Sequence, residues 1–119
     1  MRQILIISNN DTTISSIVTL LKAAGYSHID VARDSRTAYS KIYSLCPHLI
    51  ILDCEMEENE TLLVKRILAG PLANITILIV PHTNVDAYVL EGVKNGYFHF
   101  LTRPVGKDPL IFSIREILE

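Results

Sequence analysis

The sequence predicts an α/β fold in which helices cover both faces of a doubly wound, five-stranded parallel sheet. Short apolar runs alternate with amphipathic helix-like segments five times along the chain, with short connections between them. Most of the apolar runs are rich in branched residues and do not alternate with polar ones, which is typical of strands buried on both faces. The 119 residues suffice for one domain with one core.

Composition narrows the class of protein. Hydrophobic residues make up 49% of the chain, charged residues 20%, and the net charge is −2. The chain lacks the excess of basic residues that would suggest nucleic-acid binding, and none of its apolar runs approaches the roughly 18 residues of a membrane helix. A strand-like segment follows Met1-Arg2 directly, so we expect no signal peptide and a cytoplasmic location. Residues 1–119 are expected to form one domain, either a whole protein or the N-terminal part of a longer one.

The first strand is predicted over residues 3–7, before the turn cluster Ser8-Asn9-Asn10-Asp11. Asp11 or Thr12 is predicted to cap the helix that follows, and Gly25 to close it. The apolar positions at helical spacing are Ile14, Ile17, Val18 and Leu21. This region therefore predicts a strand, a loop and an amphipathic helix.

The next pair of elements is a shorter strand over residues 28–32 and a helix capped by Asp34 or Ser35. The inner face of the helix is predicted to carry Ala38, Ile42 and Leu45. Pro47 is expected to end the helix. Cys46 and Cys54 have no metal-ligand spacing, so both are predicted to be buried or half-buried thiols.

The central strand is the apolar run Leu49 to Leu52, which ends in the carboxylate of Asp53. The carboxyl ends of the strands are where ligands and chemistry collect in open α/β sheets. Asp53 is therefore the leading candidate for a functional residue. The structural alternative is that Asp53 begins a loop or caps the next helix.

The second half of the chain repeats the alternation. Acidic residues over 57–60 favour a helix start, and Gly70-Pro71 breaks that helix. A fourth strand is predicted over 75–80, and a helix capped by Thr83 extends to Asn95-Gly96. The remaining predictions are a strand over 97–102 and a last helix that starts with an Asp108 cap and Pro109, with a buried stripe of Leu110, Ile114 and Ile117.

The predicted strand ends gather a specific set of residues: Ser8 and Asn9, Asp53, Pro81 and His82, and Arg103 with Pro104. The stretches from Pro47 to Met56 and from Gly96 to Pro104 resemble the phosphoacceptor strand and the fifth strand of bacterial response regulator receiver domains. The resemblance extends from Ile4 to about Leu118. It implies a flavodoxin-like (βα)5 fold with strand order 2-1-3-4-5.

The resemblance also implies roles for individual residues. Asp53 matches the aspartate that accepts a phosphoryl group from a histidine kinase, and Phe100 matches the aromatic residue of the switch. Receivers neutralise the transferred charge with Mg²⁺, held by the acceptor and by acidic residues after strand one, and with a strand-four hydroxyl and a strand-five lysine. Phe100 is also open to a simpler interpretation as a core residue.

This chain departs from the family at those supporting positions. Neutral Ser8 and Asn9 stand where the acidic pair is expected, and Pro81 stands where the hydroxyl is expected. Bulky His82 replaces a small residue, and Arg103 replaces the lysine.

We therefore expect Mg²⁺ binding to be weak or absent, with Asp53 and Glu55 as only weak metal candidates. Arg103 is instead predicted to pair directly with Asp53, with His82 as a bridge. The Arg103–Pro104 peptide bond is a candidate for the cis form that the family shows. The histidines are predicted to lie on separate strand edges, which argues against a metal cluster.

Three functional hypotheses follow from these residues. The first is a degenerate receiver that acts through protein–protein interaction with weak or no phosphorylation, without catalytic residues or enzyme activity. The second is a functional phosphoacceptor modified on Asp53. The third, a flavodoxin-like enzyme or nucleotide binder, lacks a Gly-rich phosphate loop after the first strand.

The expected partners are a histidine kinase, an output domain or another signalling protein, and neither nucleic acid nor membrane. A homodimer through the fourth helix, fifth strand and fifth helix is a further expectation. The charged residues predicted on that face are Asp86, Glu91, Lys94, Arg115 and Glu116.

Overall fold

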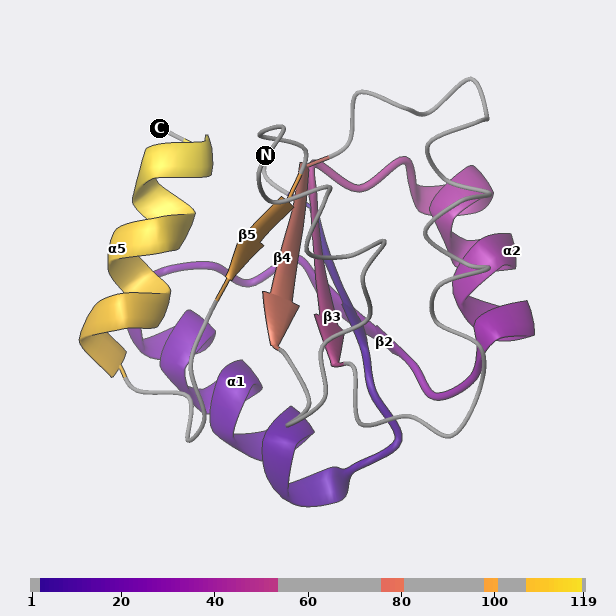
Figure 1. Ribbon diagram of the computed structural model, residues 1–119, viewed down its shortest axis with the longest axis horizontal. Helices are drawn as coiled ribbons and strands as arrows, with labels where there is room; N and C mark the ends of the chain where they lie inside the picture. Colours follow the sequence, from indigo (N-terminus) through magenta and orange to yellow (C-terminus); the bar gives the residue numbers. More distant parts are fainter. Residues whose placement is uncertain (1–2, 54–75, 81–97, 101–106, 119) are drawn as a thin grey trace.

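Parallel strands with helices on both sides form the framework of the chain (Figure 1). The computed structural model describes residues 3–53, 76–80, 98–100 and 107–118. Its elements are β1 (Ile4–Ile7), α1 (Asp11–Ala23), β2 (Ile29–Ala32), α2 (Ser35–Leu45), β3 (Leu49–Asp53), β4 (Thr76–Val80), β5 (Phe98–Phe100) and α5 (Lys107–Leu118). The strands lie in the order β2-β1-β3-β4-β5, and each neighbouring pair is parallel.

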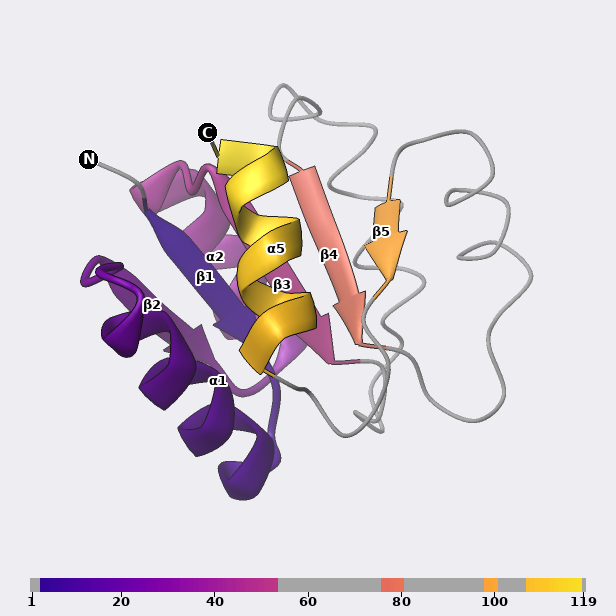
Figure 2. The same ribbon diagram turned by 90° about the vertical axis from the view of Figure 1, so that its left-hand side faces the viewer.

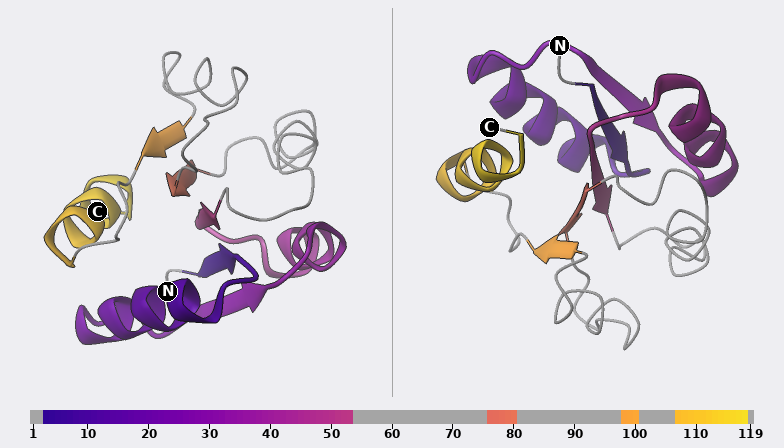
Figure 3. Two further views of the ribbon diagram at one scale, coloured as in Figure 1. Left: turned by 60° about the horizontal axis from the view of Figure 1, so that its bottom comes forward. Right: turned by 90° about the horizontal axis from the view of Figure 1, so that it is seen from above.

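The pleat of β1 and β3 divides the core into two layers. Ile6 stands in register with Val31 on one side and with Ile51 on the other. One layer joins these strands to α1 and α5, and its fully enclosed residues are Ile4, Ile6, Ile17, Leu21, Leu49, Ile51, Leu110, Ile114 and Leu118. Alternate strand residues face the opposite side. There α2 covers the sheet, as Figures 2 and 3 show from other directions. Its residues Ala38 and Ile42 are buried.

The start of α1 differs from the prediction by one residue. Asn10, rather than Asp11 or Thr12, is the N-cap, and its Oδ1 accepts a hydrogen bond from the Thr13 amide at 3.1 Å. Asp11 therefore lies inside the first turn, where a negative charge suits the positive end of the helix. Asparagine caps as well as aspartate does, so the sequence contained two equivalent candidates.

Gly25 follows the C-cap of α1 in the left-handed conformation, with φ of 96°. The Gly25 amide donates to the Lys22 carbonyl at 3.1 Å, and the Tyr26 amide donates to the Leu21 carbonyl at 3.0 Å. This pair of bonds is the Schellman motif, which satisfies carbonyls left open at a helix end. The prediction that Gly25 closes the helix is confirmed.

Asp34 caps α2 and is thus the correct one of the two predicted caps, Asp34 and Ser35. Its carboxylate accepts from the Thr37 amide at 2.7 Å and from the Thr37 hydroxyl at 3.1 Å. The helix ends at Leu45, and Cys46 adopts φ of 47° before Pro47. The prediction of a buried or half-buried thiol is wrong for Cys46, which is exposed at this left-handed position. Cys54 lies outside the described residues.

The last helix, α5, begins at Lys107, one residue before the predicted cap Asp108. Asp108 and Pro109 thus stand in its first turn, where backbone N–H groups have no partner within the helix and proline is tolerated. Leu110, Ile114 and Leu118 are its buried residues within the core layer shared with α1. Ile117 was predicted for the same stripe, but its side chain is not among those that the structure describes.

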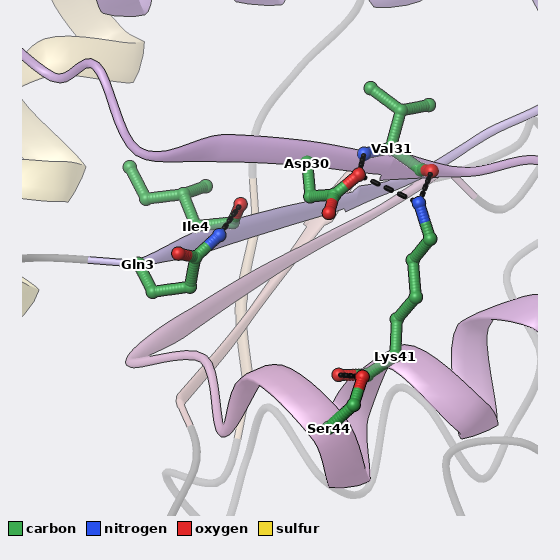
Figure 4. A network of polar contacts seen from close by, with 6 residues as sticks. All are labelled: Gln3, Ile4, Asp30, Val31, Lys41 and Ser44. Carbon is green, nitrogen blue, oxygen red and sulfur yellow. Dashed lines mark hydrogen bonds and ion pairs between the residues drawn. The ribbon is translucent and has the colours of Figure 1, made fainter.

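The sheet edge at β2 is held by a charged contact from α2. Lys41 Nζ donates to Asp30 Oδ1 at 2.7 Å and to the Val31 carbonyl at 2.8 Å, and the Val31 amide donates to Asp30 Oδ1 at 2.8 Å (Figure 4). The carbonyls of His28 and Ala32 accept from β1. Since carbonyl directions alternate along a strand, the Val31 carbonyl faces the open edge, and Lys41 covers it.

Candidate functional site

The candidate site lies where β1 and β3 end side by side. The register pairs Ile7 with Leu52, which brings Ser8 next to Asp53. Both polar residues are buried, with exposed fractions of 0% for Ser8 and 1% for Asp53. The Ser8 hydroxyl donates to Asp53 Oδ2 at 2.7 Å, while the Ser8 amide donates to the Ala32 carbonyl of β2 at 3.0 Å. The backbone ladder and the hydroxyl thus fix Ser8 and the acid relative to one another.

The direction of the Ser8 hydroxyl follows from its second contact. The Asn10 amide donates to Ser8 Oγ at 3.1 Å, so this oxygen acts there as an acceptor. Its single hydrogen is then directed to Asp53. The result is a chain of donors from the cap of α1 through Ser8 to the carboxylate of Asp53.

Other acids near this edge of the sheet are engaged in local contacts. Asp11 pairs with Arg33, which follows β2, at 2.5 Å, and both side chains are largely exposed. The Thr37 amide and hydroxyl hold the pKa of the Asp34 carboxyl below its usual value. Asn9, which was predicted to be among the site residues at the strand ends, directly follows Ser8 and is exposed. Within the described residues, no three His, Cys, Asp or Glu side chains gather as a metal site.

A divalent ion would find a poor set of ligands among these residues. Mg²⁺ takes oxygen ligands, usually including one or two carboxylates, and retains several waters. The described residues at the ends of β1 and β3 offer one carboxylate, Asp53, and its Oδ2 already accepts from a hydroxyl donor. Ser8 and Asn9 add no negative charge, so this part of the site does not suit the ion.

Several predicted site residues lie outside the described part of the chain: Glu55, Pro81, His82, Arg103 and Pro104. The Asp53–Arg103 ion pair, the His82 bridge and the cis peptide bond accordingly stay predictions. Phe100 is the last residue of β5 and stands in register with Ile79. Its role in a switch also stays a prediction.

The described histidines do not approach Asp53. His28 and His48 directly precede β2 and β3, at the amino ends of strands, whereas Asp53 ends its strand. His48 Nδ1 accepts a hydrogen bond from the Gln3 amide at 3.0 Å. His99 lies within β5, in register with Leu78. His82 falls outside the described residues.

The sequence analysis missed the donor role of Ser8 and the contribution of Asn10. Ser8 was noted only as a neutral replacement for an acid. A signal was present, because serine can donate and accept at once and the residue two positions later supplies an amide within reach. What the sequence did not indicate was which of the neighbouring polar residues turns inward.

Comparison with known proteins identifies the class. The family model described as "Response regulator receiver domain" matches residues 4–115. The chain belongs to this family. It is 26% identical over 97 residues to the uncharacterized transcriptional regulatory protein YesN of Bacillus subtilis, covering 82% of this chain and 26% of that protein.

A second relative is the protein-glutamate methylesterase/protein-glutamine glutaminase of Archaeoglobus fulgidus, at 26% identity over 105 residues, or 87% of this chain and 30% of that protein. The receiver chain therefore spans well under half the length of these two relatives.

Solved structures agree on the fold of the receiver domain. A response regulator receiver domain from Bermanella marisrubri is 21% identical, with a TM-score of 0.85 and 98% coverage of both chains. The receiver domain of a DNA-binding response regulator from Colwellia psychrerythraea 34H has a TM-score of 0.86 at 21% identity, covering 99% of this chain and 98% of that one. Chemotaxis protein CheY4 of Vibrio cholerae has a TM-score of 0.84 at 22% identity, covering 99% of each chain. The predicted flavodoxin-like receiver fold is confirmed.

The class of protein also follows from the family. The chain is a receiver domain of two-component signalling, a signalling module. In the described ranges, none of the helices combines the length and apolar character needed to cross a bilayer.

Proposed function

We propose that this receiver domain signals through contacts with other proteins, and that phosphoryl transfer to Asp53 is weak or absent. The observation that carries the proposal is the buried hydrogen bond from Ser8 to Asp53. A carboxylate that attacks a phosphoryl group needs the developing negative charge neutralised by cations held in place. Here a neutral hydroxyl stands beside the acid, where the family resemblance predicts a carboxylate for the metal.

The sequence adds support from the other side of the site. Pro81 has neither a hydroxyl nor an N–H to bind phosphoryl oxygens, and Arg103 offers a planar cation in place of the expected lysine. The proposed Asp53–Arg103 ion pair would use that cation to neutralise the acid itself. Both features fit a receiver domain that has no efficient phosphotransfer and no catalytic residues of its own.

Acetyl phosphate with Mg²⁺ tests the proposal directly, with intact mass as the measurement. A phosphorylation-competent receiver domain treated in parallel shows that the reagent works. We expect no stable gain of a phosphoryl mass on this chain. A gain that Asp53→Asn abolishes would contradict the proposal and favour the alternative, a functional phosphoacceptor modified on Asp53 by a histidine kinase.

Weak Mg²⁺ binding is part of the same proposal. Isothermal titration with MgCl₂ is expected to give no measurable binding for the natural chain at millimolar concentrations. The matched variant is Ser8→Asp, which replaces the donor with a second carboxylate beside Asp53 and is expected to bind Mg²⁺ more tightly. Tight binding by the natural chain, equal to that of Ser8→Asp, would contradict this part.

The proposed partners are a histidine kinase, an output domain or another signalling protein in the cytoplasm. The outer face of α5 supports this, because Phe112 is 65% exposed between buried turns and Arg115 and Glu116 are exposed beside it. The same face, with β5 and the helix predicted before it, is the proposed homodimer surface. Sedimentation velocity at rising concentration tests the dimer, and Phe112→Ser is expected to weaken it.

We further propose that the complete chain has the (βα)5 arrangement. Parallel neighbours such as β3 and β4 need a crossover connection, usually a helix. The helices predicted within residues 57–70 and 83–95 would supply these crossovers. Backbone chemical shifts over those two ranges test the proposal, since helical residues differ clearly from extended ones.

A further inference from the structure

The donor chain at the ends of β1 and β3 connects the acid to the first turn of α1. We propose that Ser8 is a positioning residue for Asp53 and transmits the charge of that carboxylate to the cap of α1. The proposal rests on the proposed function only in taking Asp53 as the centre of the site, and it does not require phosphoryl transfer to that residue. Ser8 and Asn10 thereby link Asp53 to a neighbouring element. Pro81, which occupies the strand-four hydroxyl position, has no hydroxyl with which to make such a link.

The first step is the geometry of the three groups. The Asn10 amide donates to Ser8 Oγ at 3.1 Å, and the Ser8 hydroxyl donates to Asp53 Oδ2 at 2.7 Å. Ser8 is fully buried and Asp53 is 1% exposed, so water does not compete freely for either group. The hydroxyl has one hydrogen, and its direction is fixed by the amide behind it.

The second step is the dependence of these bonds on charge. A hydrogen bond to an ionised acceptor is roughly twice as strong as one to a neutral acceptor. In a chain of hydrogen bonds, each donor polarises the next. If a neutral amide replaces the Asp53 carboxylate, the Ser8 bond weakens and the Asn10 amide meets a less polarised acceptor.

The third step is the position of Asn10. Its Oδ1 accepts from the Thr13 amide at 3.1 Å, and its carbonyl accepts from the Ile14 amide at 3.0 Å. Asn10 therefore joins the buried site to the first turn of a helix whose outer residues are exposed. A change in the charge of Asp53 reaches the surface at α1 over the length of two side chains.

The test measures the backbone amide of Asn10 by ¹⁵N NMR in the full chain, without Mg²⁺ or phosphodonor. Ser8→Ala removes the hydroxyl, and hydrogen exchange of the Asn10 amide is expected to accelerate roughly two- to tenfold. Ser8→Thr keeps a hydroxyl and is expected to restore the natural shift and exchange rate. Ser27→Ala, which alters an exposed serine outside the chain of donors, is the control and is expected to leave both unchanged.

A double-mutant comparison separates transmission from a merely structural role. Asp53→Asn removes the charge and is expected to shift the Asn10 and Thr13 amides in the natural background. In the Ser8→Ala background the same substitution is expected to shift both amides less, because the hydrogen bond through Ser8 is already broken. Equal shifts from Asp53→Asn in both backgrounds would overturn the proposal. If Ser8→Ala fails to fold, Ser8→Cys, a weaker donor, takes its place and is expected to give an intermediate shift.

This outcome is independent of phosphotransfer. A stable phosphoryl mass on Asp53 would contradict the proposed function and leave the Ser8 coupling intact. Additive amide shifts in the unmodified protein would contradict the coupling and leave the proposed function intact.

Discussion

The centre and the edge of the sheet each hold an aspartate with a donor at 2.7 Å, yet the two contacts differ in kind. At the centre, the donor to Asp53 is the neutral hydroxyl of Ser8, and both residues are buried. At the edge, the donor to Asp30 is the ammonium of Lys41, and the two side chains are 39% and 31% exposed, respectively. Equal distances therefore do not imply equal contributions to stability.

The difference follows from access to water. An exposed ion pair competes with hydration and salt, and its net contribution is small. A buried polar group that loses its partner keeps the full cost of its lost hydration. The centre should therefore depend on a directed hydrogen bond from a neutral donor, while the edge uses a charged donor mainly to cover an open strand.

Apolar residues that stand side by side across the edge and the centre of the sheet provide the largest expected contrast in stability. Val31, Ile6 and Ile51 stand in one register across β2, β1 and β3. Ile51→Ala creates a cavity in the enclosed core and is expected to cost about 2–5 kcal/mol of unfolding free energy. Val31→Ala at the half-buried edge is expected to cost about 1 kcal/mol. Urea denaturation followed by circular dichroism measures both, and equal losses would show that the edge is as well packed as the centre.

The polar pair at the centre ranks second. Ser8→Ala leaves Asp53 Oδ2 and the Asn10 amide without this partner, and the expected loss is about 1–3 kcal/mol. Ser8→Thr keeps the donor and should recover most of that loss, provided that its extra methyl group is accommodated. A loss for Ser8→Ala no greater than that for the exposed control Ser27→Ala would mean that the buried bond contributes little.

Much of the fold could be predicted from sequence because it depends on patterns longer than a few residues. The apolar run Leu49 to Leu52 and the spacing of Ile14, Ile17 and Leu21 each repeat one physical requirement several times. A single misjudged residue does not change such a pattern. The doubly wound α/β class follows from five such repeats in order, and the resemblance of two strand-end stretches to receiver domains added the flavodoxin-like receiver fold.

The errors fall where one residue decides the outcome. Asn10 and Asp11 are both good caps, and only the path of the chain after β1 selects Asn10. Cys46 was expected to be a buried or half-buried thiol because its spacing offers no metal site, but it is exposed in a left-handed position at the end of α2. The Ser8–Asp53 bond was missed for the same reason, since it depends on the register of β1 against β3 rather than on a local pattern.

The charged pair at the edge should depend on pH in a direction that its pKa fixes. The hydrogen bond from Lys41 lowers the pKa of the Asp30 carboxyl, against the opposing effect of partial desolvation. A lowered folded-state pKa adds stability above the unfolded-state pKa, and that stability is lost as pH falls through the folded-state value. The pair's contribution should thus be complete near neutral pH and decline as the pH falls below about 4, towards the lowered folded-state value.

Lys41→Met measures this contribution. The variant is expected to be less stable than the natural chain by about 0.2–1 kcal/mol at pH 7, with a smaller difference at acidic pH. Unfolding free energies from urea titrations across this range provide the measurement, with Lys22→Met as a control for the loss of one positive charge. A gap that widens towards acid would reverse the assigned direction of the pKa shift.

The smallest effect is expected at the exposed pair between Asp11 and Arg33. Its side chains are 81% and 57% exposed, so water and salt reach both charges. Arg33→Gln should leave the unfolding free energy at pH 7 within experimental error, at both low and high NaCl concentration. A clear, salt-sensitive loss would instead show that Arg33 acts on the carboxyl end of the sheet as a whole. In that case the division into a buried centre and a solvent-exposed charged edge would need a third region, at the start of α1.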